Sequence, residues 1–444
     1  MSPMTVLLIA AVLLSPCVNA QTSNGELLKL DEALSLARSN NRGLKRSGLE
    51  ISRQTETLSA AKTQLYPRFD ATVLAAQLLA PLNFTINAGQ FGTFPGTGPI
   101  PGSNTNLHTP ARPIAIASVT ATQPLTQLFR IHLFVSEQRL KVDAARLSFD
   151  EGDQKLTDEV RQAFYEVLES QSEHDSQESV VKYLKELQQL TERRFDQQAA
   201  LEADKLSVKA EVAKAVFQLT IIEDTLADRK ESLNHLLGRN LQTEYSVESL
   251  PATLPEEGDL TAARAVALEH RPELKQAANR VSQAKLETKI EKTHYIPDIF
   301  VQASYLTTAN ISFLPQNVGS IGVLLTWEPW DWGRKRHNVQ QDVLAENQAA
   351  LSVEDTREQI LLDVDSHFRH LRQVRAHLAV IEAARDAEKE KLRNQEEAYS
   401  QQTTLLSDLL TQQSSLANTE NEYRQAVLEY WSTRADFQKT LGEE

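Results

Sequence analysis

The sequence has very little cysteine and no apolar run long enough to cross a bilayer as a helix. Its only cysteine is Cys17, which excludes an intrachain disulfide. Its strongest apolar run, Val6 to Leu14, is well short of the ~20 residues that a membrane-spanning helix needs. It also lacks a Gly-x-Ser-x-Gly motif, a P-loop and any Cys-based metal motif. We therefore expect no enzyme activity, no catalytic residue and no cofactor.

The chain has fewer basic than acidic residues, and its formal net charge is −14 at pH 7. This balance argues against a nucleic-acid partner, which would need a basic face. It is compatible with a solvated surface or with a pore that favours cations.

The first residues are typical of a secreted protein. The apolar run is followed by the small residues Val18-Asn19-Ala20, at positions that a signal peptidase reads. We predict a signal peptide at residues 1–20, although no Lys or Arg precedes its apolar run. The alternative is a lipoprotein signal with Cys17 as the lipidated residue, against which Pro16 argues.

Proline and glycine are absent from two long segments, residues 153–237 and 334–441. Both residues break helices, and both segments are rich in good helix formers. Apolar residues recur there at helical spacing, as in Leu156, Val160, Phe164 and Val167. A helix of ~70 residues would run ~105 Å. Since helices of this length persist only by lengthwise packing, we expect long coiled-coil hairpins.

The helix breakers gather between Gln77 and Pro113, where five of the 15 glycines and six of the 16 prolines lie. This segment is predicted to be a long exposed loop. Four β-prone segments match the length of a tilted membrane strand, and they are Arg68–Leu79, Ile114–Leu125, Asp298–Asn310 and Ser320–Trp330.

Three of the four tryptophans gather at the end of the last of these strands. They are Trp327, Trp330 and Trp332, which an aromatic girdle at a membrane surface would explain. The alternative is that Trp327 and Trp330 are core residues of a soluble sheet.

The chain contains an internal repeat. Leu30 pairs with Leu260 and Pro67 with Pro297 at an offset of 230, whereas Pro124 pairs with Pro329 at 205. The offset changes inside the breaker-rich loop, where insertions are tolerated. We therefore divide the mature chain into a first repeat, 21–250, and a second, 251–444, each with a helix, two strands and a long helical hairpin.

Four strands are too few to close a barrel. An open sheet edge in lipid leaves backbone groups unsatisfied, so several copies must pool their strands, and three copies would supply twelve. The long loop would then face outward and the helices would hang into the periplasm.

The order of these elements resembles the TolC family of outer-membrane efflux proteins. The likeness lies in the helix ends Tyr66-Pro67 and Ile296-Pro297, in the segment Thr326-Trp327-Glu328-Pro329-Trp330-Asp331-Trp332-Gly333-Arg334, and in Leu405, Asp408, Leu409 and Leu410. The first half departs from the family pattern after Pro124, where Leu125-Thr126-Gln127 follows, and this predicts a less regular strand end.

The resemblance implies an α+β membrane protein of the outer membrane. Long helical hairpins would form a periplasmic tube, and four strands per chain would contribute to a trimeric 12-stranded β-barrel. It also implies a passive export conduit of a tripartite efflux or type I secretion system. The partners would be a periplasmic adaptor (membrane fusion) protein, an inner-membrane RND, ABC or MFS transporter, and outer-membrane lipid. The competing reading is a structural periplasmic coiled-coil protein without transport activity.

The resemblance further implies a gate at the periplasmic tip. Asp408 aligns with the first of the family's two gate aspartates, Thr411 stands at the second position, and Asp204 is the repeat mate of Asp408. The alternative is that both aspartates lie on a solvated helical face.

Two turns are predicted to be the hairpin tips that contact the adaptor, together with Leu206 and Leu410. The first contains Gln197, Gln198 and Leu201, and the second contains Gln401, Gln402 and Leu405. They would otherwise be ordinary turns with core leucines. His367, His370 and His377 lack a local carboxylate, so we predict no metal site there, and a metal-handling component remains a weaker alternative.

Overall fold

The structure, a computed structural model, describes residues 26–198, 201–248, 255, 258–311, 314–401 and 403–442. The predicted signal peptide with Cys17, and the tip residue Gln402, lie outside the described residues. The helices are α1 (Leu30–Asn40), α2 (Arg42–Thr63), α3 (Gln127–Asp196), α4 (Glu202–Leu236), α5 (Leu260–His270), α6 (Pro272–Thr293), α7 (Arg334–Ser400) and α8 (Leu406–Leu441). None of these helices of the described chain is long and apolar enough to cross a membrane.

The main sheet has four antiparallel strands in the order β10-β9-β7-β2. Their bounds are β2 (Arg68–Gln77), β7 (Pro113–Pro124), β9 (Asp298–Ala309) and β10 (Asn317–Thr326). The four predicted strands are thus confirmed, with β10 ending before the tryptophans. Strand β7 stays in register as far as Pro124, which pairs with Phe300, so the expected irregular end in the first half is wrong.

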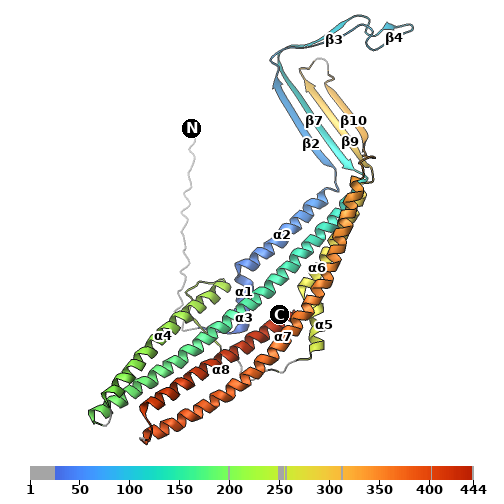
Figure 1. Cartoon of the computed structure of the whole chain (residues 1–444). Coiled ribbons are helices and arrows are strands. Elements are labelled where there is room, and N and C mark those ends of the chain that lie inside the picture. Colours follow the sequence, from blue (N-terminus) through green and yellow to red (C-terminus); the bar gives the residue numbers. More distant parts are fainter. Residues whose placement is uncertain are drawn as a thin grey trace, which may run out of the picture. The chain divides into compact units, whose positions relative to one another are not determined.

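The described residues fold as two compact units. The first, here called the helical unit, draws on residues within 1–41, 157–256 and 373–432. The second, called the sheet unit, draws on residues within 42–156, 257–372 and 433–444 and contains the main sheet. Helices α3, α7 and α8 contribute to both units. Figure 1 shows α3 with α4, and α7 with α8, as helical hairpins.

The helices repeat in length as well as in order. Helices α1 and α5 have 11 residues each, and α2 and α6 have 22 each. Helices α3 and α7 have 70 and 67 residues, and α4 and α8 have 35 and 36. The long helical hairpins expected from the sequence are therefore confirmed.

A glycine follows the second helix of each hairpin, and the two glycines share a backbone conformation and a close contact. Gly238 and Gly442 both have a positive φ, of 68° and 71°. A Cβ on Gly238 would lie 2.7 Å from the carbonyl oxygen of Asn40 at the end of α1, and one on Gly442 would lie 3.1 Å from His270 at the end of α5. Only glycine combines this backbone conformation with so close an approach.

Helix α3 is longer than the sequence predicts, because it starts at Gln127 and runs through Gly152. A glycine inside a helix costs about 1 kcal/mol relative to alanine, which a long packed helix tolerates. Gly152 faces α2, since a Cβ there would lie 3.9 Å from the Ser47 hydroxyl.

The predicted loop at residues 77–113 contains strands as well. Strand β3 (Leu82–Ile86) pairs with β6 (Thr105–Thr109), and β4 (Thr93–Phe94) pairs with β5 (Gly98–Pro99). The sequence analysis did not predict these short strands, because the many glycines and prolines of this segment are typical of a loop. A short parallel pair, β1 (Glu26–Leu28) with β8 (Tyr245–Val247), was also missed, since three residues show no periodicity.

The helical unit has an apolar core along its hairpins. Its buried residues come from α3, α4 and α8, and they are Val181, Leu184, Leu187, Val208, Ala215 and Leu406. A smaller cluster joins α7 to α8 through Leu392, Leu409 and Leu416. These contacts fix the hairpins side by side and hold their turns at one end.

Candidate functional site

The two predicted turns are where the chain reverses between long helices. Helix α3 ends at Asp196 and α4 begins at Glu202, and α7 ends at Ser400 before α8 begins at Leu406. The leucines of the two turns have nearly equal exposure, 70% for Leu201 and 69% for Leu405. Leu206 is exposed as well, whereas Leu410 packs against the core of the helical unit. Three of these four leucines are therefore available to a partner.

The two aspartates of the predicted gate both stand in the first turn of a helix. Asp204 Oδ2 accepts a hydrogen bond from the Leu201 backbone N–H at 3.2 Å, which caps α4. Asp408 Oδ2 accepts one from the Thr404 hydroxyl at 3.1 Å, at the start of α8. A carboxylate at this position also interacts favourably with the helix dipole. Each aspartate thus has a structural role, whatever it does in a pore.

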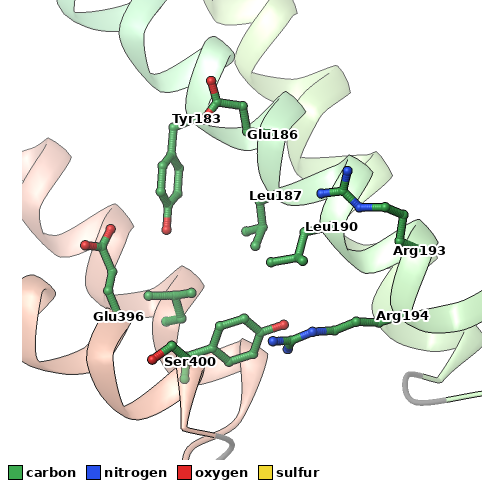
Figure 2. Close-up of a pocket in the computed structure, with 10 residues that line it drawn as sticks. Tyr183, Glu186, Leu187, Leu190, Arg193, Arg194, Glu396 and Ser400 are labelled. Atoms are coloured by element: carbon green, nitrogen blue, oxygen red, sulfur yellow. The ribbon is translucent and has the colours of Figure 1, made fainter. Parts of the chain in front are cut away.

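A cavity of about 360 Å³ lies close to these turns, between α3 and the α7–α8 hairpin (Figure 2). Its polar lining consists of Tyr183, Glu186, Arg193, Arg194, Glu396, Tyr399 and Ser400. Leu187, Leu190 and Leu409 supply the apolar part. The cavity therefore combines charges of both signs with an apolar part.

Two pairings across the cavity involve tyrosines. Burial raises the pKa of Tyr183 to about 12, and the adjacent carboxylate of Glu396 adds to the shift. The Arg194 guanidinium lies 4.9 Å from the ring centroid of Tyr399, which is a cation–π contact. Sequence reasoning missed this group, because the pairing of α3 with α7 depends on tertiary packing that no spacing along the chain reveals.

The main sheet has one apolar face. Cross-strand neighbours lie on the same face, and the register aligns Val323 with Val301, Val119 with Tyr305, and Val73 with Ala117. The face they share carries Ile321, Val323 and Leu325 of β10, Ile299, Val301, Ala303 and Tyr305 of β9, Ala117, Val119, Ala121 and Gln123 of β7, and Phe69, Ala71, Val73 and Ala75 of β2.

The opposite face carries every charged residue of the four strands. These residues are Arg68, Asp70 and Asp298, and hydroxyl groups lie beside them. The hydroxyls of Ser304 and Ser320 are 2.7 Å apart on this face, and Arg68 pairs with Asp70 at 2.7 Å. This face also carries Leu74, Ile116, Phe300, Leu306 and Leu324, so the sheet is divided by charge: all charged side chains of its strands lie on this polar face and none on the apolar one.

The edges of the sheet are free within the described chain. Strands β2 and β10 each pair on one side only, and each has ten residues. Because every pairing is antiparallel, three steps across the sheet leave these two strands pointing in opposite directions. The edge of one copy can therefore pair antiparallel with the opposite edge of another.

The tryptophans follow β10 in the link to α7. Trp327 is 56% exposed, and Trp330 and Trp332 are more exposed still. The rings of Trp330 and Trp332 meet edge-on at 6.1 Å. Such exposure excludes the alternative that Trp327 and Trp330 belong to the core of this chain, and their role at a membrane surface stays a prediction.

Asp331, between these tryptophans, caps α7. Its carboxylate accepts the backbone N–H groups of Gly333 and Lys335, at 3.1 and 2.9 Å. The bond from Lys335 is the main reason that the pKa of Asp331 is lowered.

Two of the three predicted histidines of α7, His367 and His377, have partners other than histidine. His367 Nδ1 donates to the Asp363 carbonyl oxygen at 2.8 Å. His377 lies 3.9 Å from the Glu429 carboxylate. Among the described residues, no group of three or more His, Cys, Asp or Glu side chains is placed to hold a metal ion.

Comparison with protein families identifies a match in the second half of the chain. Residues 264–443 match the family model of the outer membrane efflux protein. No curated protein sequence matches the chain.

Solved structures match along nearly the whole chain. The CmeC outer membrane channel of Campylobacter jejuni aligns with a TM-score of 0.74 at 13% identity, covering 93% of this chain and 85% of that one. The VceC outer membrane protein of Vibrio cholerae gives 0.70 at 14% identity, with 93% and 96% covered. The open-state MtrE outer membrane channel of Neisseria gonorrhoeae gives 0.70 at 17%, with 93% and 89% covered. Residues 264–443 therefore resemble the outer membrane efflux protein family, and the chain has, along nearly its whole length, the fold of these outer-membrane channels.

Proposed function

We propose that three copies of this chain form one channel of the outer membrane, a passive conduit for export. The observation that carries the proposal is the main sheet, with an apolar face, a polar face and two free edges of equal length and opposite direction. In lipid the apolar face meets the acyl chains, and the polar face lines the pore.

The free edges provide the reason for assembly. An unpaired backbone group costs several kcal/mol in hydrocarbon, so a four-stranded sheet alone is strongly disfavoured there. Pairing β2 of each copy with β10 of the next removes every edge when the ring closes. Three copies give twelve strands, above the minimum of about eight for a closed barrel.

The long helices then belong on the periplasmic side, and their turns are the docking end. We place the contact with a periplasmic adaptor at Gln197, Gln198, Leu201, Gln401 and Leu405, since the two leucines are exposed without a partner from this chain's core. The cavity beside them would receive an adaptor side chain. The adaptor links the channel to an inner-membrane transporter of the RND, ABC or MFS type.

The assembly is tested by purifying the chain in detergent and measuring its mass and its conductance in planar bilayers. We expect a trimer that conducts ions. A soluble monomer without conductance would contradict the proposal and favour the structural coiled-coil alternative.

The docking end is tested with Leu201→Glu and Leu405→Glu. Each places a charge on an exposed apolar contact, so we expect adaptor binding to fall while the trimer and its conductance persist. Leu49→Glu on α2 is a matched control, since Leu49 is 68% exposed. Unchanged adaptor binding by both turn variants would refute the contact.

A further inference from the structure

The segment between β2 and β7 is built as an extended arm. We call residues 78–111 the arm. The Leu78 N–H donates to the Arg112 carbonyl at 3.2 Å, which prolongs the β2–β7 ladder into its base. Strands β3 and β6 pair over five residues beyond it, and β4 pairs with β5 near the tip. In Figure 1, β3 and β4 extend past the ends of β2 and β7.

The arm is uncharged and its large apolar side chains are exposed. Between Asp70 and Arg112 the sequence contains no Asp, Glu, Lys or Arg. The exposed large apolar residues of the arm are Leu79, Leu82, Phe84, Phe91, Phe94 and Ile100. A two-stranded hairpin is marginally stable by itself in water, and exposed aromatic side chains add to that cost. The arm therefore needs a surface to cover it.

The second hairpin of the sheet leaves room for such a surface. Strands β9 and β10 are joined across only 310–316, a link far shorter than the arm. Leu314 in this link and Val318 in β10 are both exposed apolar side chains. When β2 of one copy pairs with β10 of the next, the arm emerges directly beside the neighbour's short hairpin.

We propose that the arm of each copy docks on the next copy of the chain in the trimer, over the end of its β9–β10 hairpin. This rests on the proposed function, because it uses the ring in which β2 borders the neighbouring β10. In a three-fold ring the contact closes on itself, so all three arms are covered in the same way.

The composition of the arm favours a copy of the chain over a charged lipid surface. Binding to anionic headgroups requires Lys or Arg side chains, which the arm lacks. The chain as a whole carries a net charge of −14, which on average opposes the approach of two copies. An uncharged apolar arm is a part of the surface that can approach a neighbouring copy without this repulsion.

Cross-linking tests the contact. The sequence after the predicted signal peptide contains no cysteine, so Phe84→Cys, Phe91→Cys and Phe94→Cys each provide one thiol. Each purified trimer is labelled with a photoreactive maleimide and irradiated, with the same variant dissociated in denaturant as the control. We expect covalent dimers and trimers, with the linked site on the neighbouring copy mapped to Leu314 or to the first residues of β10.

Several outcomes would overturn the inference. One is a trimer whose labels link only within their own chain or to lipid. Another is a triple variant, Phe84→Asn with Phe91→Asn and Phe94→Asn, whose trimer dissociates at the same temperature as the unmodified one. A preparation that is monomeric by mass would instead count against the proposed channel, so the two failures are distinguishable.

Discussion

The two halves of the chain share their helices but differ in their connections. The corresponding helices agree in length to within three residues over as many as 70. The strand hairpins, in contrast, are closed by the long arm in one half and by a short link in the other. Helices packed along their whole length cannot change independently, whereas connections at a surface can. The connections are therefore where each half acquired its own properties.

The junctions between strand and helix show the same contrast. In the first half only Leu125 and Thr126 separate β7 from α3, and the Thr126 hydroxyl both donates to the Pro297 carbonyl and accepts from the Ile299 N–H, at 2.8 and 2.9 Å. In the second half residues 327–333 separate β10 from α7, and Asp331 caps the helix. The short junction between β7 and α3 is thus hydrogen-bonded to the sheet, whereas the longer junction between β10 and α7 is hydrogen-bonded to its own helix.

An arginine on the apolar face of the sheet should impair membrane insertion equally in the two halves of the chain. This is the largest effect that we expect. Val73→Arg and Val323→Arg each place a charge on the apolar face. A cost of roughly 2–4 kcal/mol per chain near the bilayer centre should sharply reduce insertion. Folding into lipid vesicles, followed by gel mobility without heating, measures it. Thr72→Arg points to the polar face, and an equal loss there would contradict the assignment of the faces.

The first junction should depend on one hydroxyl. Thr126→Val keeps the shape of the side chain but removes two hydrogen bonds between the start of α3 and the start of β9. We expect a loss of about 1–3 kcal/mol in the free energy of unfolding, because a backbone donor and an acceptor lose their partner. Denaturant unfolding measures it, with Thr120→Val in β7 as the control. Equal stability of the two variants would refute the bracing role.

The second junction should depend on pH instead. The pKa of the Asp331 carboxyl is lower in the folded chain than in the unfolded one. Its stabilisation is therefore present at pH values above the unfolded pKa and is lost as the pH falls through the folded pKa. The protection factors of the amides at the start of α7, which compare each exchange rate with the intrinsic rate at the same pH, should therefore fall in acid. In Asp331→Ala these protection factors should already be low at neutral pH and should change little on acidification, so a wild-type-like fall in this variant would contradict the assignment.

The smallest difference that we expect is between the two hairpin turns, and it concerns only the ion selectivity of the channel. We expect Asp408→Asn to lower the preference of the channel for cations, because three such carboxylates would gather at the constriction. Asp204→Asn should change it little. In each variant the asparagine Oδ1 can still accept the hydrogen bond of the aspartate that it replaces, from the Leu201 N–H or from the Thr404 hydroxyl, so the loss of stability should be similar. The reversal potential under a salt gradient measures this cation preference. An equal shift for the two variants would contradict a gate role that belongs to Asp408 alone.

Much of the architecture was predictable because it depends on patterns local to the chain. The absence of helix breakers predicted the long helices, and the internal repeat together with the family resemblance placed both turns. Alternating β-prone segments predicted the four strands to within a few residues. The start of α3 and the strands of the arm were missed, because Gly152 and the many glycines and prolines near β4 are tolerated by packing and pairing that local patterns do not show.

The contacts of the candidate site were less predictable. The residues of the turns could be named from the sequence, yet the cavity formed by Tyr183, Arg194, Glu396 and Tyr399 could not. These residues come from helices separated by some two hundred positions, and their meeting depends on which faces of α3 and α7 are packed together.

The sequence by itself determined the long helices and the four long strands, that the plan occurs twice, and that four strands are too few to close a barrel. Helix formation and strand alternation are set by neighbouring residues, so they can be read along the chain. The tertiary structure decided which face of the sheet is apolar, which edges are free, and which side chains from distant helices share a cavity. These depend on strand register and helix packing, which are fixed by contacts between residues far apart in sequence.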